Sequence, residues 1–308
     1  MPRIAYLGPE GTFTESALRR MISGGLVPGG GEMTAVPTES NPAALAAVRD
    51  GTVDFACVPI ENSIDGSISP TLDSLAAGTR LQIFAELTLD VAFSIVVRPD
   101  RPDRTGDIDT VAAFPVAAAQ VRRWLAAQLP DARVVPAHSN AAAAVDVAEG
   151  RADAGVTTAL AAERYHLRSL AAGVVDEANA RTRFVLVGVP APPPARTGVD
   201  RTSVVLRVPN TPGALVNAMT ELSIRDIDLT RIESRPTRTE MGVYVFFLDF
   251  VGHLDDDAVA EALKALHRRC ADVRYLGSWP TGAPAGAVPP GGDDATRWLT
   301  GLRQGEDR

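Results

Sequence analysis

The first part of the chain alternates short apolar runs with Ala-rich segments of helical spacing. The runs RIAYLG, MTAVP and DFACVPI are typical of buried strands, and residues 15–22 and 42–48 between them have the spacing of helices. Strands that alternate with helices in this way are typical of βαβ units. The pattern therefore predicts an α/β domain with a largely parallel sheet over residues 1–189.

A second region with a different rhythm follows over residues 201–280. Its predicted elements are a strand (DRTSVVLRVP), a helix (PGALVNAMTELSI), two strands (DLTRIESRPT and MGVYVFFLDFVG), a helix (DDDAVAEALKALHRRC) and a strand (DVRYLGSWP). The order βαββαβ is that of the ferredoxin-like split motif. We therefore expect a second, smaller α/β domain.

Two stretches rich in chain breakers separate and end these regions. Residues 190–198, PAPPPARTG, contain four prolines and predict a stiff linker over residues 190–200. Residues 281–308 are dominated by Pro, Gly and Asp and predict a mostly disordered tail, in which Trp298 and Leu299 could form one helical turn.

Composition excludes several classes of function. The chain has 308 residues and a net charge of −8 without any run of Lys and Arg, so nucleic acid is not an expected partner. No stretch has the length and apolarity of a membrane span, and the N-terminus does not have the pattern of a signal peptide, so we expect a cytoplasmic protein. The spacing of the two cysteines and four histidines predicts neither a disulfide nor a metal site.

One sequence pattern occurs twice without a gap. Residues 40–54, SNPAALAAVRDGTVD, and 139–153, SNAAAAVDVAEGRAD, both fit S-N-x-A-A-x-x-x-V-x-x-G-x-x-D, with Ser40 and Ser139 as N-caps. Any αβ unit can converge on this pattern. Alternatively, two similar lobes each direct a helix N-terminus to a shared cleft, which would suit an anion such as a carboxylate. His138 precedes the second N-cap and faces either that cleft or solvent.

Polar residues that could carry chemistry lie at predicted strand-to-helix junctions. Thr12 and Thr14 lie in LGPEGTFTESA, which matches no nucleotide-binding motif but offers hydroxyls and amides to a carboxylate. Glu61, Asn62 and Ser63 follow the strand FACVPI, and ligands of open α/β sheets bind beyond the carboxyl ends of strands. Both segments can also be read as ordinary capped turns.

The third junction contains Thr182 and Arg183, just before a strand that we expect to start at Phe184. A guanidinium can hold a carboxylate through two parallel hydrogen bonds. A strand start with a solvated Arg is the simpler alternative.

Three groups of motifs, in this order along the chain, resemble the prephenate dehydratase family. They are YLGPEGTFTESA with VPIENSIDGSI; YHLRSLAAGVVDEANARTRFVLV, which ends in a Thr-Arg-Phe signature; and PGAL with LTRIESRP, which are similar to the regulatory ACT domain of these enzymes. The resemblance covers all of the chain except the tail.

The resemblance implies an activity, a fold and a form of regulation. A carbon–oxygen lyase would convert prephenate to phenylpyruvate, water and CO2 in L-phenylalanine biosynthesis, without a cofactor because aromatisation drives the reaction. It implies a two-lobed catalytic domain like a periplasmic binding protein, followed by an ACT domain. The ACT domain would bind phenylalanine as feedback inhibitor between the subunits of a homodimer or homotetramer.

Site residues follow from the motifs and the resemblance together. We expect a catalytic group of Thr182, Arg183, Phe184, Glu61, Asn62 and Ser63; a substrate-binding group of Thr12, Thr14, Ser40, Ser139 and Asn140; and an effector group of Asn210, Gly213, Ala214, Leu215, Glu233, Ser234, Arg235 and Pro236. Thr182, which the family marks as essential, would donate a hydrogen bond to the leaving hydroxyl. Glu61, kept protonated by burial, would supply the proton, and Arg183 would hold the pyruvyl carboxylate.

Two other functions are consistent with the same sequence features. The same chemistry on arogenate differs only by an amino group on the substrate side chain. An amino-acid sensor without catalysis would have the same domains, but it would not need Thr182 and Arg183 together with Glu61 at strand ends.

Overall fold

The computed structural model of the chain describes residues 1–101, 105–177, 179–237, 241–282, 286–287 and 295–306. It divides into two compact units, the first of residues 1–71 and 87–186 and the second of residues 72–86 and 187–308. This division differs from a single boundary near residue 189. Residues 72–86 lie in the region expected to be catalytic but pack with the C-terminal region.

The first sheet has six strands in the order β2-β1-β3-β11-β5, with β4 paired to β3. Its strands are β1 (Arg3–Leu7), β2 (Thr34–Thr38), β3 (Phe55–Asn62), β4 (Gly66–Ser67), β5 (Gln82–Asp90) and β11 (Arg181–Gly188). The helices between its early strands are α1 (Phe13–Ser23), α2 (Asn41–Arg49) and α3 (Ser69–Ala76). β1 runs parallel to both of its neighbours, as the βαβ pattern predicts. β5 and β11 each contain residues of both units.

A second sheet of the first unit has the order β10-β6-β9-β7-β8. Its strands are β6 (Phe93–Val97), β7 (Thr110–Ala113), β8 (Arg133–Pro136), β9 (Ala154–Thr157) and β10 (Arg168–Val174), accompanied by η1 (Thr105–Asp107), α4 (Pro115–Gln120), α5 (Arg122–Gln128), α6 (Asn140–Ala148) and α7 (Ala159–Arg164). The sheet is mixed, where a largely parallel one is predicted. β7 is parallel to β8 and β9, whereas β6, which brings the chain into this lobe, is antiparallel to β9 and β10.

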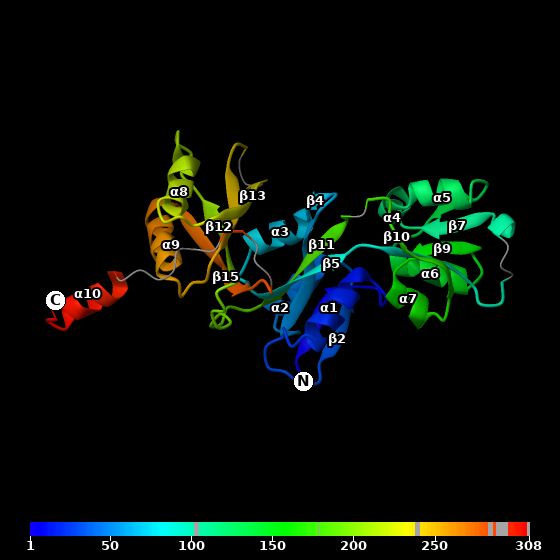
Figure 1. Cartoon of the computed structure of the whole chain (residues 1–308), viewed down its shortest axis with the longest axis horizontal. Helices are drawn as coiled ribbons and strands as arrows, with labels where there is room; N and C mark the ends of the chain where they lie inside the picture. The colour runs from blue at the N-terminus through cyan, green and yellow to red at the C-terminus, as the bar shows by residue number, and fades with distance from the viewer. Residues whose placement is uncertain (102–104, 178, 238–240, 283–285, 288–294, 307–308) are drawn as a thin grey trace. The chain divides into compact units, whose positions relative to one another are not determined.

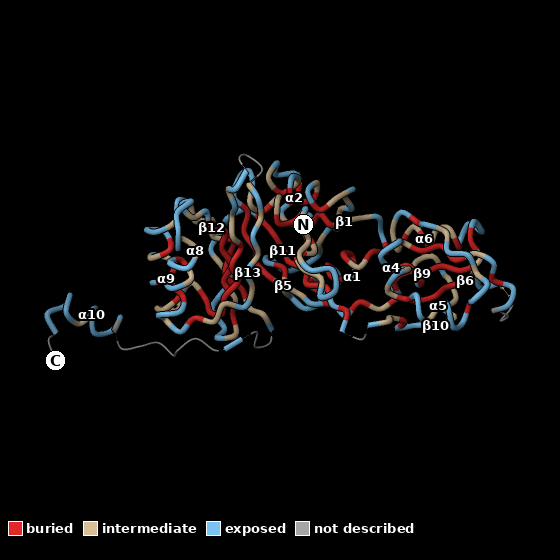
Figure 2. The backbone as a smooth tube through the Cα atoms, turned by 90° about the horizontal axis from the view of Figure 1, so that it is seen from above, coloured by how far each residue is buried: buried red, intermediate tan, exposed pale blue. Residues whose placement is uncertain are grey.

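Helices cover both faces of this second sheet. Leu125 of α5 packs in one apolar cluster with Ile95 and Val97, while Val147 of α6 packs in another with Val96. Successive side chains of β6 thus point to opposite faces. Figures 1 and 2 show α5 and α6 on opposite sides of β9.

The C-terminal region forms the predicted βαββαβ fold. Its elements are β12 (Asp200–Arg207), α8 (Ala214–Ser223), β13 (Leu229–Pro236), β14 (Tyr244–Val251), α9 (Asp257–Arg269) and β15 (Asp272–Pro280). The antiparallel sheet has the order β13-β14-β12-β15. Both helices pack on one face of it around Val204, Leu248 and Leu266, which are fully buried, and strands β12 and β14 contain long buried stretches (Figure 2).

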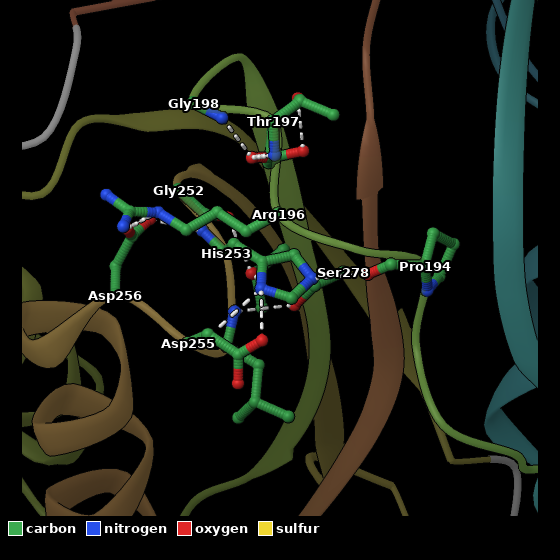
Figure 3. A network of polar contacts seen from close by, with 12 residues as sticks. Pro194, Arg196, Thr197, Gly198, Gly252, His253, Asp255, Asp256 and Ser278 are labelled. Carbon is green, nitrogen blue, oxygen red and sulfur yellow. Dashed lines mark hydrogen bonds and ion pairs between the residues drawn. The ribbon is translucent and has the colours of Figure 1, made fainter.

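The proline-rich linker, which belongs to the second unit, is held in place by a buried histidine. His253 is fully buried, and its Nδ1 accepts a hydrogen bond from the Asp255 amide at 3.1 Å, so Nε2 carries the proton and donates to the Pro194 carbonyl at 2.9 Å. Arg196 pairs with Asp256 at 2.5 Å (Figure 3). The linker therefore has defined contacts although residues 190–198 form neither helix nor strand.

The C-terminal segment contains a helix where a mostly disordered tail is predicted. Helix α10 (Ala295–Arg303) extends the single expected turn because Trp298, Leu299 and Leu302 fall on one face at helical spacing. Most of the remaining predicted tail lies outside the described residues. Within the part of the chain that the structure describes, no helix is both long and apolar enough to cross a membrane.

Candidate active site

A cavity of about 840 Å³ lies within the first unit, where several strands end. Its lining includes Leu7 at the end of β1, Thr38 at the end of β2, Asn62 at the end of β3 and Phe114 directly after β7. Of the expected site residues, Thr12, Thr14, Asn62, Ser139, Asn140, Thr182 and Phe184 line this cavity. The rule that ligands bind beyond the carboxyl ends of strands thus located it correctly.

Thr182 and Asn62, which are 120 residues apart in sequence, meet in this cavity. Asn62 Nδ2 donates to Thr182 Oγ1 at 2.9 Å. Asn62 Oδ1 accepts from the amides of Ile64 at 2.8 Å and Asp65 at 3.0 Å, which fixes the orientation of the side-chain amide. Because the Thr182 hydroxyl accepts the bond from Asn62, it keeps its own proton for another partner. The arrangement therefore makes Thr182 a hydrogen-bond donor at the cavity wall.

Arg183 and Glu61 do not line the cavity. Both lie inside strands, since β3 extends to Asn62 and β11 begins at Arg181 rather than at Phe184. Side chains alternate along a strand, so Arg183 points away from the face that carries Thr182 and Phe184. Arg183 Nη2 pairs with Glu61 Oε2 at 3.1 Å, and Arg183 is only 9% exposed.

This placement corrects the roles expected for both residues. The Glu61 side chain is 40% exposed and pairs with Arg183, so the burial that was expected to keep Glu61 protonated is absent. Arg183 likewise holds Glu61 instead of reaching toward a ligand in the cavity. The sequence predicts both residues in loops, whereas β3 and β11 include them, and inside a strand adjacent side chains point to opposite faces.

Ser63 also lies outside the cavity lining, but it positions the strand that carries Thr182. Its hydroxyl donates to the Asn179 carbonyl at 2.9 Å and accepts from the Arg181 amide at 2.8 Å. The Ser63 amide donates to the Arg181 carbonyl at 2.8 Å. These bonds join the end of β3 to the start of β11.

Two helix N-termini contribute to the cavity. Thr12 caps α1 by accepting from the Glu15 amide at 3.3 Å, and Ser139 caps α6 by accepting from the Ala142 amide at 2.9 Å. The first amides of each helix have no partner within the helix, and they form the positive end of the helix dipole. The cavity is therefore suited to anions at two places.

The repeated pattern adopts the same local structure in both copies but does not serve the cavity equally. Ser40 caps α2 by accepting from the Ala43 amide at 3.2 Å, just as Ser139 caps α6, and each helix has nine residues. Ser139 lines the cavity, whereas Ser40 does not, although the preceding Thr38 and Glu39 do. Only the second copy therefore has its capping serine at the wall of this cavity.

A buried carboxylate supports the loop that leads into α1. Glu15 is 4% exposed, accepts from the Gly11 amide at 2.5 Å and pairs with Arg164 at 2.8 Å. Gly11 has a φ of +90°, and a Cβ there would lie 2.9 Å from the Cβ of Ala161. Burial raises the pKa of Tyr6 to about 12, with a smaller contribution from the negative charge of Glu15, so this phenol stays neutral. The Thr12-x-x-Glu15 spacing is that of a capping box and could have revealed the role of Glu15.

The charges around the cavity are mostly negative. The described residues of its lining include Glu10, Glu39 and Asp65 but neither Arg nor Lys. His138 was expected to face either the cleft or solvent; it lines the cavity and is also exposed to solvent. Elsewhere in the described chain, no group of three or more His, Cys, Asp or Glu could hold a metal ion. Among the described parts of the lining, the N-termini of α1 and α6 are the features that favour an anion.

The sequence prediction did not include Phe114, which lines the cavity. The residue follows the apolar strand β7 and precedes Pro115, the first residue of α4. The strand-end rule that selected Asn62 applies equally to Phe114, so a signal was present in the sequence.

A smaller cavity of about 300 Å³ lies in the second unit. Asn210, Gly213, Ala214 and Leu215 line it together with Tyr244 and Phe246, which the sequence argument did not include. The other expected effector residues, Glu233, Ser234, Arg235 and Pro236, lie on β13 outside its lining. In the β13–β14 register, Ser234 pairs with Phe246 and Pro236 with Tyr244, so β13 is adjacent to the cavity wall.

Comparisons with known proteins agree over the whole chain. The family model Prephenate dehydratase matches residues 4–191, and the model ACT domain matches residues 202–268. A curated prephenate dehydratase of Mycobacterium sp. (strain KMS) is 79% identical over 309 residues, covering 99% of this chain and 97% of the relative.

Solved structures show the same similarity. A prephenate dehydratase from Arthrobacter aurescens, solved in complex with L-Phe, has a TM-score of 0.86 and 37% identity, covering 98% of this chain and 99% of its own. GqqA, described as a novel type of quorum-quenching acylase, has a TM-score of 0.77 and 30% identity, covering 91% and 98%.

Proposed function

The chain belongs to the prephenate dehydratase family, and we propose that the cavity of the first unit is the place where it converts prephenate to phenylpyruvate, water and CO2. The observation that supports this site best is the Thr182 hydroxyl, oriented by Asn62 in a cavity with two helix N-termini.

The reaction needs little from the protein beyond orientation and hydrogen bonding. The bond from the ring to its carboxylate breaks and releases CO2, and that electron pair enters the ring. The C4–O bond breaks with its electron pair on oxygen, and the departing hydroxide takes one proton to become water. Because the ring becomes aromatic, the chemistry requires no external oxidant or reductant.

Thr182 acts as the donor to the departing oxygen. Its proton is available because Asn62 occupies an acceptor position on the same hydroxyl. A threonine hydroxyl is too weak an acid to give up its proton completely, so it stabilises the developing negative charge by a hydrogen bond. Solvent then supplies the proton, a role for which Glu61 is poorly suited because of its ion pair with Arg183.

The N-termini of α1 and α6 hold the pyruvyl carboxylate. A strong cation on the carboxylate that leaves would stabilise the substrate more than the transition state, so the ring carboxylate should lie where positive potential is weak. The lack of Arg and Lys among the described lining residues supports this division.

Phenylpyruvate formation tests this function directly. The full chain is incubated with prephenate, and phenylpyruvate is followed by its ultraviolet absorbance, with arogenate in a parallel reaction. We expect turnover of prephenate to exceed that of arogenate. No turnover of either substrate would favour a sensor. Hydrolysis of an acyl amide at a comparable rate would favour an acylase activity of the kind described for GqqA.

Phenylalanine binds the cavity of the second unit and inhibits the enzyme. The relative from Arthrobacter aurescens was solved with L-Phe, and the ACT family match covers the residues that form this cavity. Its lining is apolar and aromatic at Leu215, Tyr244 and Phe246, and the first amides of α8 can receive the carboxylate. We expect this site to act within a homodimer or homotetramer, which sedimentation with and without phenylalanine would test.

A further inference from the structure

Helix α3 (Ser69–Ala76) belongs to both units. It connects the first unit, which contains the cavity around Thr182 (the catalytic cavity), to the second unit, which contains the cavity around Gly213 (the effector cavity). The unit boundary falls between Thr71 and Leu72, so the helix starts in the first unit and ends in the second. The segment just before it provides Asp65 and Ile68 to the catalytic cavity. The Ile68 amide donates to the Ile60 carbonyl at 3.0 Å, which links this segment to β3.

The C-terminal end of α3 is bound by one arginine of the ACT domain, Arg274. Arg274 Nη1 donates to the carbonyls of Leu75 and Ala77, and Nη2 to that of Gly78, each at 3.1 Å. These are carbonyls at a helix C-terminus, where the dipole favours a cation. The end of α3 is therefore held by strand β15.

A second arginine binds the middle of α3 from the other edge of the ACT sheet. Arg235 of β13 donates to Asp73 through two parallel hydrogen bonds, Nε to Oδ1 at 2.9 Å and Nη2 to Oδ2 at 3.0 Å. The two side chains are 18% and 24% exposed. A bidentate pair depends on the relative orientation of both planar groups, so it transmits movement better than a single contact between point charges.

Arg235 also lies next to the wall of the effector cavity. Its neighbours Ser234 and Pro236 pair with Phe246 and Tyr244 of β14, and both aromatic rings line that cavity. A ligand that moves β14 will move β13 with it, because the two strands share a ladder of hydrogen bonds. The shift then reaches Asp73 through Arg235.

We propose that Asp73 is a positioning residue for feedback regulation: the Arg235–Asp73 ion pair couples occupancy of the effector cavity to the position of α3, and thereby to Asp65 and Ile68 in the catalytic cavity. The proposal rests on the proposed binding of phenylalanine to the ACT domain. Coupling of this kind typically changes affinity or activity by about 5- to 150-fold.

Asp73→Asn tests this coupling, with Asp272→Asn as a matched control. The first change removes the charge that Arg235 recognises and keeps the size of the side chain. The control breaks the Arg80–Asp272 pair at 3.1 Å, which joins the same segment to β15, at the opposite edge of the sheet from β13. Asp73→Glu keeps the charge and serves as the conservative variant.

Three quantities are measured on the full chain: prephenate turnover without phenylalanine, the concentration and extent of inhibition by phenylalanine, and phenylalanine binding by calorimetry in the absence of substrate. For Asp73→Asn we expect turnover and phenylalanine binding within about twofold of the original chain and inhibition weakened about fivefold or more. Asp272→Asn should be inhibited like the original chain, and Asp73→Glu should recover part of the inhibition.

The outcomes separate this proposal from the proposed function. Unchanged inhibition of Asp73→Asn would overturn the coupling role, and so would equal loss of inhibition in Asp272→Asn. Loss of phenylalanine binding by Asp73→Asn would assign Asp73 to the effector site itself and overturn the proposal. If the original chain neither bound phenylalanine nor was inhibited by it, the proposed effector function would be wrong. If Asp73→Asn lost basal turnover through misfolding, Asp73→Glu would decide: weaker inhibition than in the original chain at normal turnover would support the proposal, and inhibition equal to that of the original chain would contradict it.

Discussion

The catalytic cavity and the effector cavity differ in how the chain builds them. The lining of the catalytic cavity is drawn from residues between Leu7 and Phe184, at the ends of strands from two sheets. The described lining of the effector cavity comes from two short stretches. Residues 208–216 are a loop and the start of α8, and residues 242–246 are a turn and the start of β14. The first site therefore depends on the tertiary arrangement of distant segments, while the second depends on local backbone geometry.

The two cavities share the kind of group that is suited to anions. The described lining of the catalytic cavity contains neither Arg nor Lys, and that of the effector cavity contains no charged side chain. Helix N-termini are present at both, those of α1 and α6 at the first and that of α8 at the second. A chain with a net charge of −8 can thus bind carboxylates through backbone amides.

Loss of the Thr182 hydroxyl should have the largest effect and should be confined to the catalytic cavity. Thr182→Val keeps the shape of the side chain, and we expect kcat to fall ~10²-fold or more, the range typical of a positioned acid or donor. Thr182→Ser, which keeps the hydroxyl, should retain much more activity. Phenylpyruvate formation measures both. Equal rates for Thr182→Val and the original chain would remove Thr182 from the mechanism.

A change at Asn62 should have the next largest effect. In Asn62→Asp the acceptor for the amides of Ile64 and Asp65 remains, but the donor to Thr182 is lost, so the Thr182 proton turns toward the new carboxylate. We expect kcat to fall ~10- to 100-fold, as for the loss of one oriented hydrogen bond worth about 1–3 kcal/mol. Asn179→Asp, at an exposed position of the same junction, is the control and should change kcat little.

Backbone strain should act on the effector cavity instead. Gly213 has a φ of +78° at the N-terminus of α8, and Gly213→Ala would impose a strain of about 1–2 kcal/mol on the loop that lines the cavity. The phenylalanine concentration for half-inhibition should rise about fivefold or more. Gly173→Ala introduces similar strain at φ +71° in β10 and should leave inhibition unchanged. Equal shifts in both variants would contradict a local effect.

The smallest effects should distinguish the two copies of the repeated pattern. Ser40→Ala and Ser139→Ala each remove a helix cap, and each should lower the free energy of unfolding by about 1 kcal/mol, measured by chemical denaturation. Only Ser139→Ala should also raise KM for prephenate, by about two- to fivefold, because only Ser139 lines the catalytic cavity. Equal KM changes would mean that both helices contact the substrate.

Local sequence signals predicted elements and junctions well but failed where the direction of a side chain was decisive. The Ser-capped helices and the βαββαβ order follow from spacing of one or two turns, and the structure contains them. Arg183 and Glu61 were expected in the cavity because they adjoin Thr182 and Asn62. In strands, adjacent residues point to opposite faces, and these two form an ion pair on the other side.

The sequence by itself determined the fold class, the order of elements and the family, and it singled out Thr182 as a candidate, because those depend on local periodicity and on motifs of consecutive residues. The tertiary structure decided that Asn62 orients Thr182, that Arg183 does not face the cavity and that Arg235 binds Asp73. Each of these depends on which distant strands are neighbours and in what register. That information arises only when sheets form and bury their faces.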